Sequence, residues 1–310
     1  MLKGRDLLSI HDLTVEEINE ILELARVLKV KLRGESEHKL LKGKTLGLIF
    51  EKSSTRTRVS FEAGMYQLGG QAMFLSHRDL QLGRGEPIQD TARVLSRYLD
   101  GIMLRTFGHD KLVEFAQWAA VPVINGLTDL LHPCQALTDL LTIREYCGQN
   151  LRGLKLAYIG DGNNMAHSLM YACAKMGIDF TVATPEGYDP DPQIVQNARA
   201  DAHRLGTLIS LTHDAAEAVK DADILYTDTW ISMGKEEEAD RRRHDFAGYQ
   251  VNRALLQLAA KRAIVMHCLP AHRGEEITAD VFEENADIIF EQAENRLHTQ
   301  KAILALTMGD

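Results

Sequence analysis

The sequence has few of the residues that mark secreted, membrane-spanning or disordered proteins. Its 310 residues include only 4 Cys, too few for a disulfide framework, so we expect a reducing, cytoplasmic location. No uninterrupted apolar run approaches the roughly 18 residues of a membrane helix, and the charged start does not read as a signal peptide. Lys and Arg number 35 against 44 Asp and Glu, so neither nucleic acid nor a membrane is an expected partner.

What the sequence does contain is a regular alternation of short β-rich apolar runs and longer amphipathic patterns. This alternation is typical of parallel α/β units, and the length suits about two domains. The fold class that we expect is therefore α/β, with two doubly wound parallel-sheet domains and an active-site cleft between them. We expect strands at 45–50, 71–75, 102–105, 121–124, 155–159, 179–183, 207–211, 223–227 and 263–267.

The predicted domains divide near residue 147. Residues 1–147 would form the first domain and 148–290 the second. A long last helix is expected at about 279–307, and its part from about 291 to 310 would pack back on the first domain.

Polar side chains gather where the predicted strands end. In open α/β sheets, ligands bind beyond the carboxyl ends of the strands, so these clusters predict one ligand-binding cleft. The clusters are Glu51–Arg58, Arg105, His132–Gln135, Gly160–Asn164, Asp228–Gly234 and His267–Pro270.

The segment Ser53–Arg58 predicts an anion site. Four hydroxyls and two arginines stand where a strand turns into a helix, so backbone N–H groups and guanidinium donors converge there. The alternative is simple N-capping by Ser and Thr with solvated arginines. A nucleotide P-loop is not indicated, because no G-x-x-x-x-G-K-[ST] pattern occurs.

Two other patterns suggest cofactors only weakly. Gly160–Asn164 follows a strand like a dinucleotide fingerprint, but the third glycine would fall at Met165, so the asparagines fit substrate donors better. A zinc set lacks the usual paired spacing, and neither a metal nor a cofactor is expected. The residues of this zinc set would be His132, Cys134, His267 and Cys268. Surface positions are expected for three other histidines, His203, His213 and His298.

Five motifs, taken in order, resemble the ornithine branch of the aspartate/ornithine carbamoyltransferase family over essentially the whole chain. They are Ser54–Arg58, His132–Gln135, Asp161–Asn164, Asp228–Gly234 and His267–Pro270. The resemblance implies a transferase of one-carbon groups that moves the carbamoyl group of carbamoyl phosphate to the δ-amine of L-ornithine, giving L-citrulline and phosphate. It also implies a homotrimer or a multiple of trimers.

The resemblance further implies roles for individual residues. The catalytic residues would be Arg56, Arg105, His132 and Cys268. Carbamoyl phosphate would be bound by Ser54, Thr55, Arg56, Thr57, Gln81, Arg105, His132, Gln135, Cys268, Leu269 and Arg296. The first domain would thus hold carbamoyl phosphate and the second ornithine, through Asn163, Asn164, Asp228, Ser232 and Met233.

Several alternatives remain open at this point. Within the class, the acceptor could be putrescine or N-acetylornithine, and outside it the chain could be a non-catalytic anion-binding protein of the same fold. Either a thiolate at Cys268 or the leaving phosphate could accept the proton of the δ-amine. The charged run Lys235–Arg243 is either a solvated loop or, with Ser232, a mobile lid with few contacts that closes over ornithine.

Overall fold

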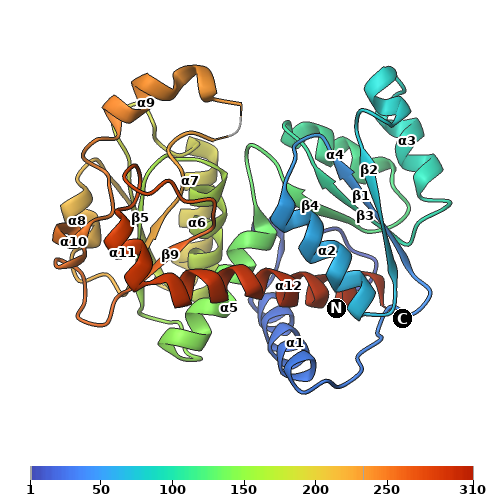
Figure 1. The fold of residues 1–310 in the computed structure, drawn as a ribbon, viewed down its shortest axis with the longest axis horizontal. Coiled ribbons are helices and arrows are strands. Elements are labelled where there is room, and N and C mark those ends of the chain that lie inside the picture. The colour runs from blue at the N-terminus through green and yellow to red at the C-terminus, as the bar shows by residue number, and fades with distance from the viewer. Residues whose placement is uncertain (1, 233, 310) are drawn as a thin grey trace. The chain divides into compact units, whose positions relative to one another are not determined.

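The computed structural model describes residues 2–232 and 234–309, which form two compact units. The first unit is Met1–Leu141 with Glu294–Asp310, and the second is Thr142–Ala293. Each unit contains a parallel sheet accompanied by helices (Figure 1), so the predicted fold class of two parallel-sheet α/β domains is confirmed. None of the helices among the described residues is both long and apolar enough to cross a membrane.

The first unit has a four-stranded parallel sheet in the order β2-β1-β3-β4. Its strands are β1 Thr45–Phe50, β2 Gln71–Ser76, β3 Gly101–Arg105 and β4 Val123–Leu127, within three residues of the predicted bounds. The helices are η1 Ile10–Asp12, α1 Val15–Arg33, α2 Thr55–Gln67, η2 Gln81–Arg84, α3 Ile88–Leu95 and α4 His109–Trp118. Helix α5 Pro133–Cys147 begins in this unit and belongs to the second unit from Thr142 onward. Because β2 and β3 lie on opposite sides of β1, the strand order reverses there, which is where open α/β sheets bind ligands.

The second unit has a five-stranded parallel sheet in the order β7-β6-β5-β8-β9, which reverses between β5 and β8. Its strands are β5 Lys155–Ile159, β6 Asp179–Ala183, β7 Ile209–Thr212, β8 Ile224–Thr227 and β9 Ile264–His267. The helices are α6 Asn164–Met176, α7 Pro192–His203, α8 Ala215–Val219, η3 Glu236–Glu238, α9 Ala239–Asp245, α10 Arg253–Leu256 and α11 Ala279–Glu284. The last helix, α12 Ala286–Met308, starts in the second unit and belongs to the first unit from Glu294 onward.

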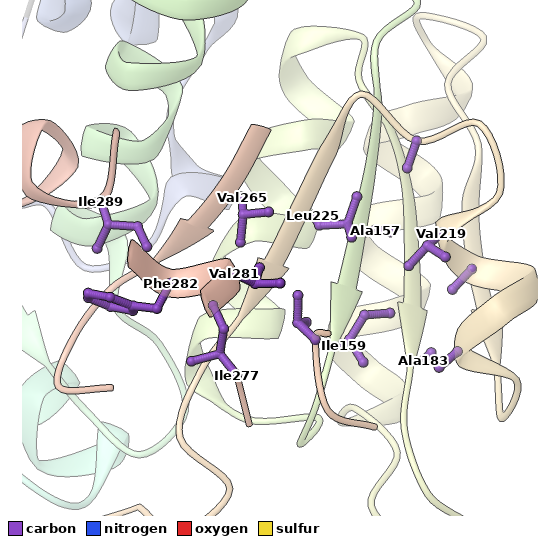
Figure 2. Packing of buried hydrophobic residues seen from close by; sticks show 14 residues of the cluster. Ala157, Ile159, Ala183, Val219, Leu225, Val265, Ile277, Val281, Phe282 and Ile289 are labelled. Atoms are coloured by element: carbon purple, nitrogen blue, oxygen red, sulfur yellow. The ribbon is translucent and has the colours of Figure 1, made fainter. Parts of the chain in front are cut away.

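One face of the second sheet carries the apolar cluster drawn in Figure 2. Ala157 and Ile159 alternate along β5 and therefore point to the same face. The small side chain of Ala157 leaves room for close packing beside Leu225 of β8, and both are fully buried. The core thus holds β5 and β8 rigidly up to the residues that follow them.

The predicted single helix at 279–307 is wrong in one respect, because α11 and α12 are separated at Asn285. Its side-chain Nδ2 donates to the carbonyl oxygen of Val281 (2.8 Å) and its Oδ1 accepts from the N–H of Val265 (3.4 Å). Asn side chains that bond the backbone compete with helical hydrogen bonds, which accounts for the break.

The expectation that Lys235–Arg243 has few contacts is also wrong. The segment forms η3 and the first part of α9, and the Arg242 side chain is buried. Its Nη1 donates to Asp161 Oδ2 (2.8 Å) and to the carbonyl of Trp230 (3.0 Å), while Nε donates to Glu238 Oε2 (2.8 Å). A paired buried arginine anchors this segment, and its closure over substrate stays a prediction.

His203 and His213 are exposed, as expected, but the surface position predicted for His298 is wrong. The His298 side chain is fully buried in α12, with Nε2 3.2 Å from Glu294 Oε1. Burial and the nearby Lys301 ammonium lower the pKa of His298 to about 4, against the stabilising effect of Glu294.

We therefore expect acid to destabilise the protein partly through His298. The unfolded chain binds a proton near pH 6.5 whereas the folded chain does so only near pH 4. Stability should consequently fall as the pH decreases from about 6.5 to 4, by about 1–3 kcal/mol from this group. Chemical denaturation of wild type and His298→Gln at several pH values would check this. The slope in that window should be smaller in the variant, and equal slopes would contradict the assignment.

Candidate active site

The N-terminus of α2 lies directly beyond the end of β1. Ser54 is the N-cap residue, and its Oγ accepts the N–H of Thr57 at 3.3 Å. The Ser54 hydroxyl also donates to Thr57 Oγ1 at 3.1 Å. The capping alternative is therefore correct for Ser54, and it places a helix N-terminus, which attracts anions, at the reversal of the strand order.

Three arginines gather near this helix end. Arg105 ends β3, is only 5% exposed, and has a buried Nε without a hydrogen-bond partner among the described residues. Burial, together with the positive charges of Arg296 and Arg56, lowers the pKa of Arg105 to about 9. Asp129 opposes this shift. Like charges held this close in a buried place favour a bound anion.

The second arginine predicted from the strand–helix junction does not join this arrangement. Arg58 is exposed, its Nε donates to Glu62 Oε1 (3.0 Å), and its guanidinium lies 3.8 Å from the centroid of the Phe74 ring. Within Ser53–Arg58, Arg56 is therefore the arginine that contributes to the charge cluster.

Arg296 of α12 is held in place by several side chains. Its Nη1 donates to Gln135 Oε1 (2.7 Å) and its Nη2 to Thr57 Oγ1 (3.2 Å). With its amide oxygen turned toward Arg296, Gln300 accepts from Nε (3.2 Å) and Nη2 (3.0 Å). Gln135 in turn donates from Nε2 to Asp139 Oδ1 (2.8 Å). The guanidinium is thus fixed before any ligand binds.

His132 lies beside the same arginines at the start of α5. Burial, followed by the charges of Arg296, Arg105 and Arg56, lowers the pKa of His132 well below 6.5. The imidazole is therefore neutral at pH 7, so it can donate one hydrogen bond to a ligand oxygen but carries no positive charge.

The remaining residues of the first unit differ in what they can do. Cys134 is buried, burial raises the pKa of its thiol to about 12, and Sγ donates to the carbonyl of Asn125 at 3.4 Å. It is a packing residue. Thr55 is the exposed first residue of α2. Gln81 is exposed on η2.

The second unit places a carboxylate and an amide together where its strand order reverses. Asp228 follows β8, and its Oδ1 accepts from the N–H of Thr229 (2.8 Å) and from Cys268 Sγ (3.0 Å). Asn163 follows β5, and its Nδ2 donates to Asp228 Oδ2 at 3.0 Å. The structure thus brings Asp228, Asn163 and Cys268 together, with the thiol of Cys268 as a hydrogen-bond donor to the carboxylate.

The loop after β9 is organised by a buried histidine. Nδ1 of His267 accepts from the N–H of Leu269 (2.9 Å), so its Nε2 is the donor to Glu276 Oε1 (3.0 Å). Leu269 has a left-handed φ of 60°, an uncommon conformation for a branched side chain. His267 therefore fixes the turn that presents Cys268, and the structure places Cys268 and Leu269 in the second unit.

Three further residues were predicted to bind ornithine. Asn164 begins α6 and is partly buried, and Ser232 is partly buried after β8. Met233 lies outside the described residues.

Two groups of described side chains could supply metal ligands. Their ligand atoms lie within 4.8 Å of one another, and the groups are Asp228, His267, Cys268 and His272, Glu275, Glu276. Both nitrogens of His267 already have protein partners, so the first group would have to rearrange to bind a cation. The zinc set considered from the sequence is divided, because His132 and Cys134 belong to the first unit.

The residues that hydrogen-bond to the predicted site residues and hold them in place were not themselves predicted from the sequence. Asp139 and Gln300 each stand four positions after a predicted site residue, Gln135 and Arg296, on the same helix face. That i, i+4 spacing was a usable signal. Tyr158, whose hydroxyl donates to Asn163 Oδ1 (3.1 Å), gave none, because it reads as a core residue of a strand.

Comparison with known families matches both units. Residues 5–145 match the carbamoyl-P binding domain of aspartate/ornithine carbamoyltransferase, and residues 152–307 match its Asp/Orn binding domain.

Whole-chain relatives agree with these matches. An ornithine carbamoyltransferase of Oceanobacillus iheyensis is 56% identical over 100% of this chain and 96% of its own length. That of Symbiobacterium thermophilum is 58% identical over 99% of both chains. The solved ornithine carbamoyltransferase of Pyrococcus furiosus has a TM-score of 0.96 at 55% identity, covering 99% of this chain and 98% of the other. The chain belongs to the aspartate/ornithine carbamoyltransferase family.

Proposed function

We propose that this protein transfers the carbamoyl group of carbamoyl phosphate to the δ-amine of L-ornithine, giving L-citrulline and phosphate. The observation that carries the proposal is the charge of the first unit, where Arg56, Arg105 and Arg296 surround a helix N-terminus. The match of this unit to a carbamoyl-P binding domain and the naming of full-length relatives at 55–58% identity support it.

Carbamoyl phosphate is proposed to bind with its phosphate on the first turn of α2. Ser54, Thr55 and Arg56 would hold the phosphate oxygens there, since a guanidinium and helix N–H groups suit that anion. Gln135 would receive the carbamoyl amine on the second lone pair of the oxygen that Arg296 already engages. Leu269 and Cys268 of the second unit would complete the site, and Gln81 would reach it from a neighbouring subunit.

The carbonyl oxygen of the carbamoyl group becomes negative as the amine attacks. Arg105 supplies positive charge, and neutral His132 supplies a hydrogen-bond donor. Thr57 Oγ1 accepts from Ser54 and Arg296, which leaves its own proton to donate to the carbamoyl oxygen. Donors fixed in advance around a developing oxyanion lower the barrier, and each one removed typically costs about 2.7–4 kcal/mol.

Ornithine is proposed to bind the second unit. The Asp228 carboxylate would pair with its α-ammonium, while Asn164 and Ser232 would hold its α-carboxylate and Met233 would cover its methylenes. Cys268 Sγ already donates a hydrogen bond to Asp228 (3.0 Å), which supports the leaving phosphate rather than a thiolate as the final proton acceptor. We further propose that the two half-sites form one interdomain active site.

The apparent KM for ornithine should fall as the pH rises. Only the neutral δ-amine can attack, and its pKa is about 10.4 by analogy with lysine, so the reactive fraction increases about tenfold per unit between pH 7 and 9. Steady-state rates on total ornithine would measure this, with the KM for carbamoyl phosphate as the internal reference. A constant ornithine KM over this range would contradict the proposed nucleophile.

A panel of acceptors tests the function itself. Phosphate release from carbamoyl phosphate should be rapid with L-ornithine and should yield citrulline in equal amount. Putrescine, which lacks the α-carboxylate, and N-acetylornithine, which lacks the α-ammonium, should be poor acceptors, as should aspartate. If one of these compounds were the preferred acceptor, the proposed substrate would be wrong. If no acceptor were carbamoylated, the protein would be an anion-binding protein without this activity.

We also propose a cytoplasmic homotrimer or a multiple of trimers. The edge strand β2 and the adjoining helix α2 expose large apolar side chains, including Tyr66 (81% exposed) and Val59 (56%). Exposed apolar patches of this kind support an interface between subunits. Analytical ultracentrifugation should give three chains per particle or a multiple, and a monomer would contradict the proposal.

A further inference from the structure

The amide of Asn163 has one orientation available to it. Its Oδ1 accepts three hydrogen bonds, from the backbone N–H groups of Met165 (2.9 Å) and Ala166 (3.2 Å) and from the hydroxyl of Tyr158 (3.1 Å). An inverted amide would place its NH2 group against these three donors. The environment therefore specifies which end of the amide is oxygen.

This orientation turns the Asn163 NH2 group toward Asp228. Nδ2 donates to Asp228 Oδ2 (3.0 Å), while Oδ1 of the same carboxylate accepts from the N–H of Thr229 (2.8 Å). Both carboxylate oxygens are thus held, and the plane of the carboxylate is set. The orientation of the Asp228 carboxylate therefore depends on the Asn163 amide, whose oxygen is held by its own three hydrogen-bond donors.

Tyr158 is well suited to fix that amide permanently. It is fully buried in β5, and its ring stacks on Tyr226 with centroids 5.9 Å apart and an interplanar angle of 20°. Burial, with the nearby Asp228, Cys268 and Asp161, raises the pKa of its hydroxyl well above 10, whereas the hydrogen bond to Asn163 lowers it. The phenol therefore remains a donor over the whole range in which the enzyme would work.

We infer that Tyr158 and Asn163 are positioning residues that set the Asp228 carboxylate for the α-ammonium of the acceptor. Asn163 is thereby assigned to act through Asp228, and Tyr158 to act through Asn163. The inference rests on the proposed function, because it takes Asp228 as the partner of the amino-acid substrate.

Asn163→Ser separates positioning from helix capping. Serine caps helix N-termini about as well as asparagine, so α6 should keep its stability, but the donor to Asp228 is lost. We expect the KM for ornithine to rise about tenfold, since a hydrogen bond to a charged group is removed. The KM for carbamoyl phosphate and the thermal midpoint should stay near wild type. An unchanged ornithine KM, or a lowered thermal midpoint with an unchanged KM, would overturn the inference.

Tyr158→Phe tests the role of the Tyr158 hydroxyl, and a matched control is available. The ring and its stack remain and only the hydroxyl is removed, so the ornithine KM should rise about threefold to tenfold. Tyr171→Phe is the control, because Tyr171 is also buried and its hydroxyl accepts from Asn197 (3.3 Å), but it lies within α6. Equal ornithine KM values in the two variants would overturn the role of Tyr158. Wild type is assayed first: if it makes no citrulline, the proposed function fails, whereas an active wild type with unaffected variants refutes only the positioning.

Discussion

Replacing Arg56 with alanine should lower kcat/KM for carbamoyl phosphate by about 1,000-fold. Arg56 stands in the first turn of α2 beside Arg105 and Arg296, so its loss removes both a guanidinium fork and part of the positive charge. Removing a single preorganised donor from a developing anion costs about 100-fold to 1,000-fold in rate, and weaker phosphate binding adds to this. Steady-state kinetics and calorimetry with carbamoyl phosphate would measure both parts.

The loss should not come from unfolding. Alanine is a good helix former, so the thermal midpoint of Arg56→Ala should stay close to that of wild type. Arg26→Ala is a suitable control, because Arg26 is exposed on α1 and pairs with Glu23. Wild-type affinity for carbamoyl phosphate in Arg56→Ala would show that the phosphate site lies elsewhere.

Asp228→Asn should produce the second large effect, a fall of about 100-fold in kcat/KM for ornithine. The substitution removes the negative charge proposed to meet the α-ammonium, and charged hydrogen bonds of this kind contribute about 1.5–3 kcal/mol. It also places an NH2 group among donors, because Asp228 accepts from Asn163, Thr229 and Cys268. Carbamoyl phosphate should bind as tightly as before.

A matched control separates this effect from a general loss of acidic charge. Asp221 is exposed in the second unit with a left-handed φ of 57°, which asparagine also tolerates, so Asp221→Asn should have wild-type kinetics. If Asp228 served only as a helix cap, the substitution would lower thermal stability and leave the ornithine KM unchanged.

The sequence predicted those features that depend on short stretches of chain. The strand at 45–50 follows from an apolar run and its bounds are correct, and the hydroxyl-rich segment after it does turn into a helix, α2. Chain order also placed Asp228 and Asn163 at strand ends, since parallel strands bring such ends to one edge of a sheet. The break of the last helix at Asn285 was not predicted, because a side-chain hydrogen bond to the backbone leaves no periodic pattern in the sequence.

Features that depend on distant partners could not be predicted in this way. Arg296 and Gln135 are 161 positions apart, and only the folded first unit brings them within 2.7 Å. The neutral state of His132 likewise follows from its burial in the folded unit and, after that, from three arginines on other elements. His298 was expected at the surface, and Arg242 in a solvated loop or a mobile lid, because charged and titratable side chains are usually exposed. Partners such as Asp161 for Arg242 allow burial.

The most direct test of the central claim is the binding of a single molecule that joins a phosphonate, a carbonyl group and an ornithine chain. If one active site uses the arginines of the first unit and Asp228 of the second, calorimetry should find one such molecule per chain. Its Kd should be at least about 100-fold lower than that of ornithine or of the phosphonate fragment alone. Both Arg56→Ala and Asp228→Asn should weaken it strongly. Affinity no higher than that of the phosphonate fragment, with Asp228→Asn unaffected, would contradict the account.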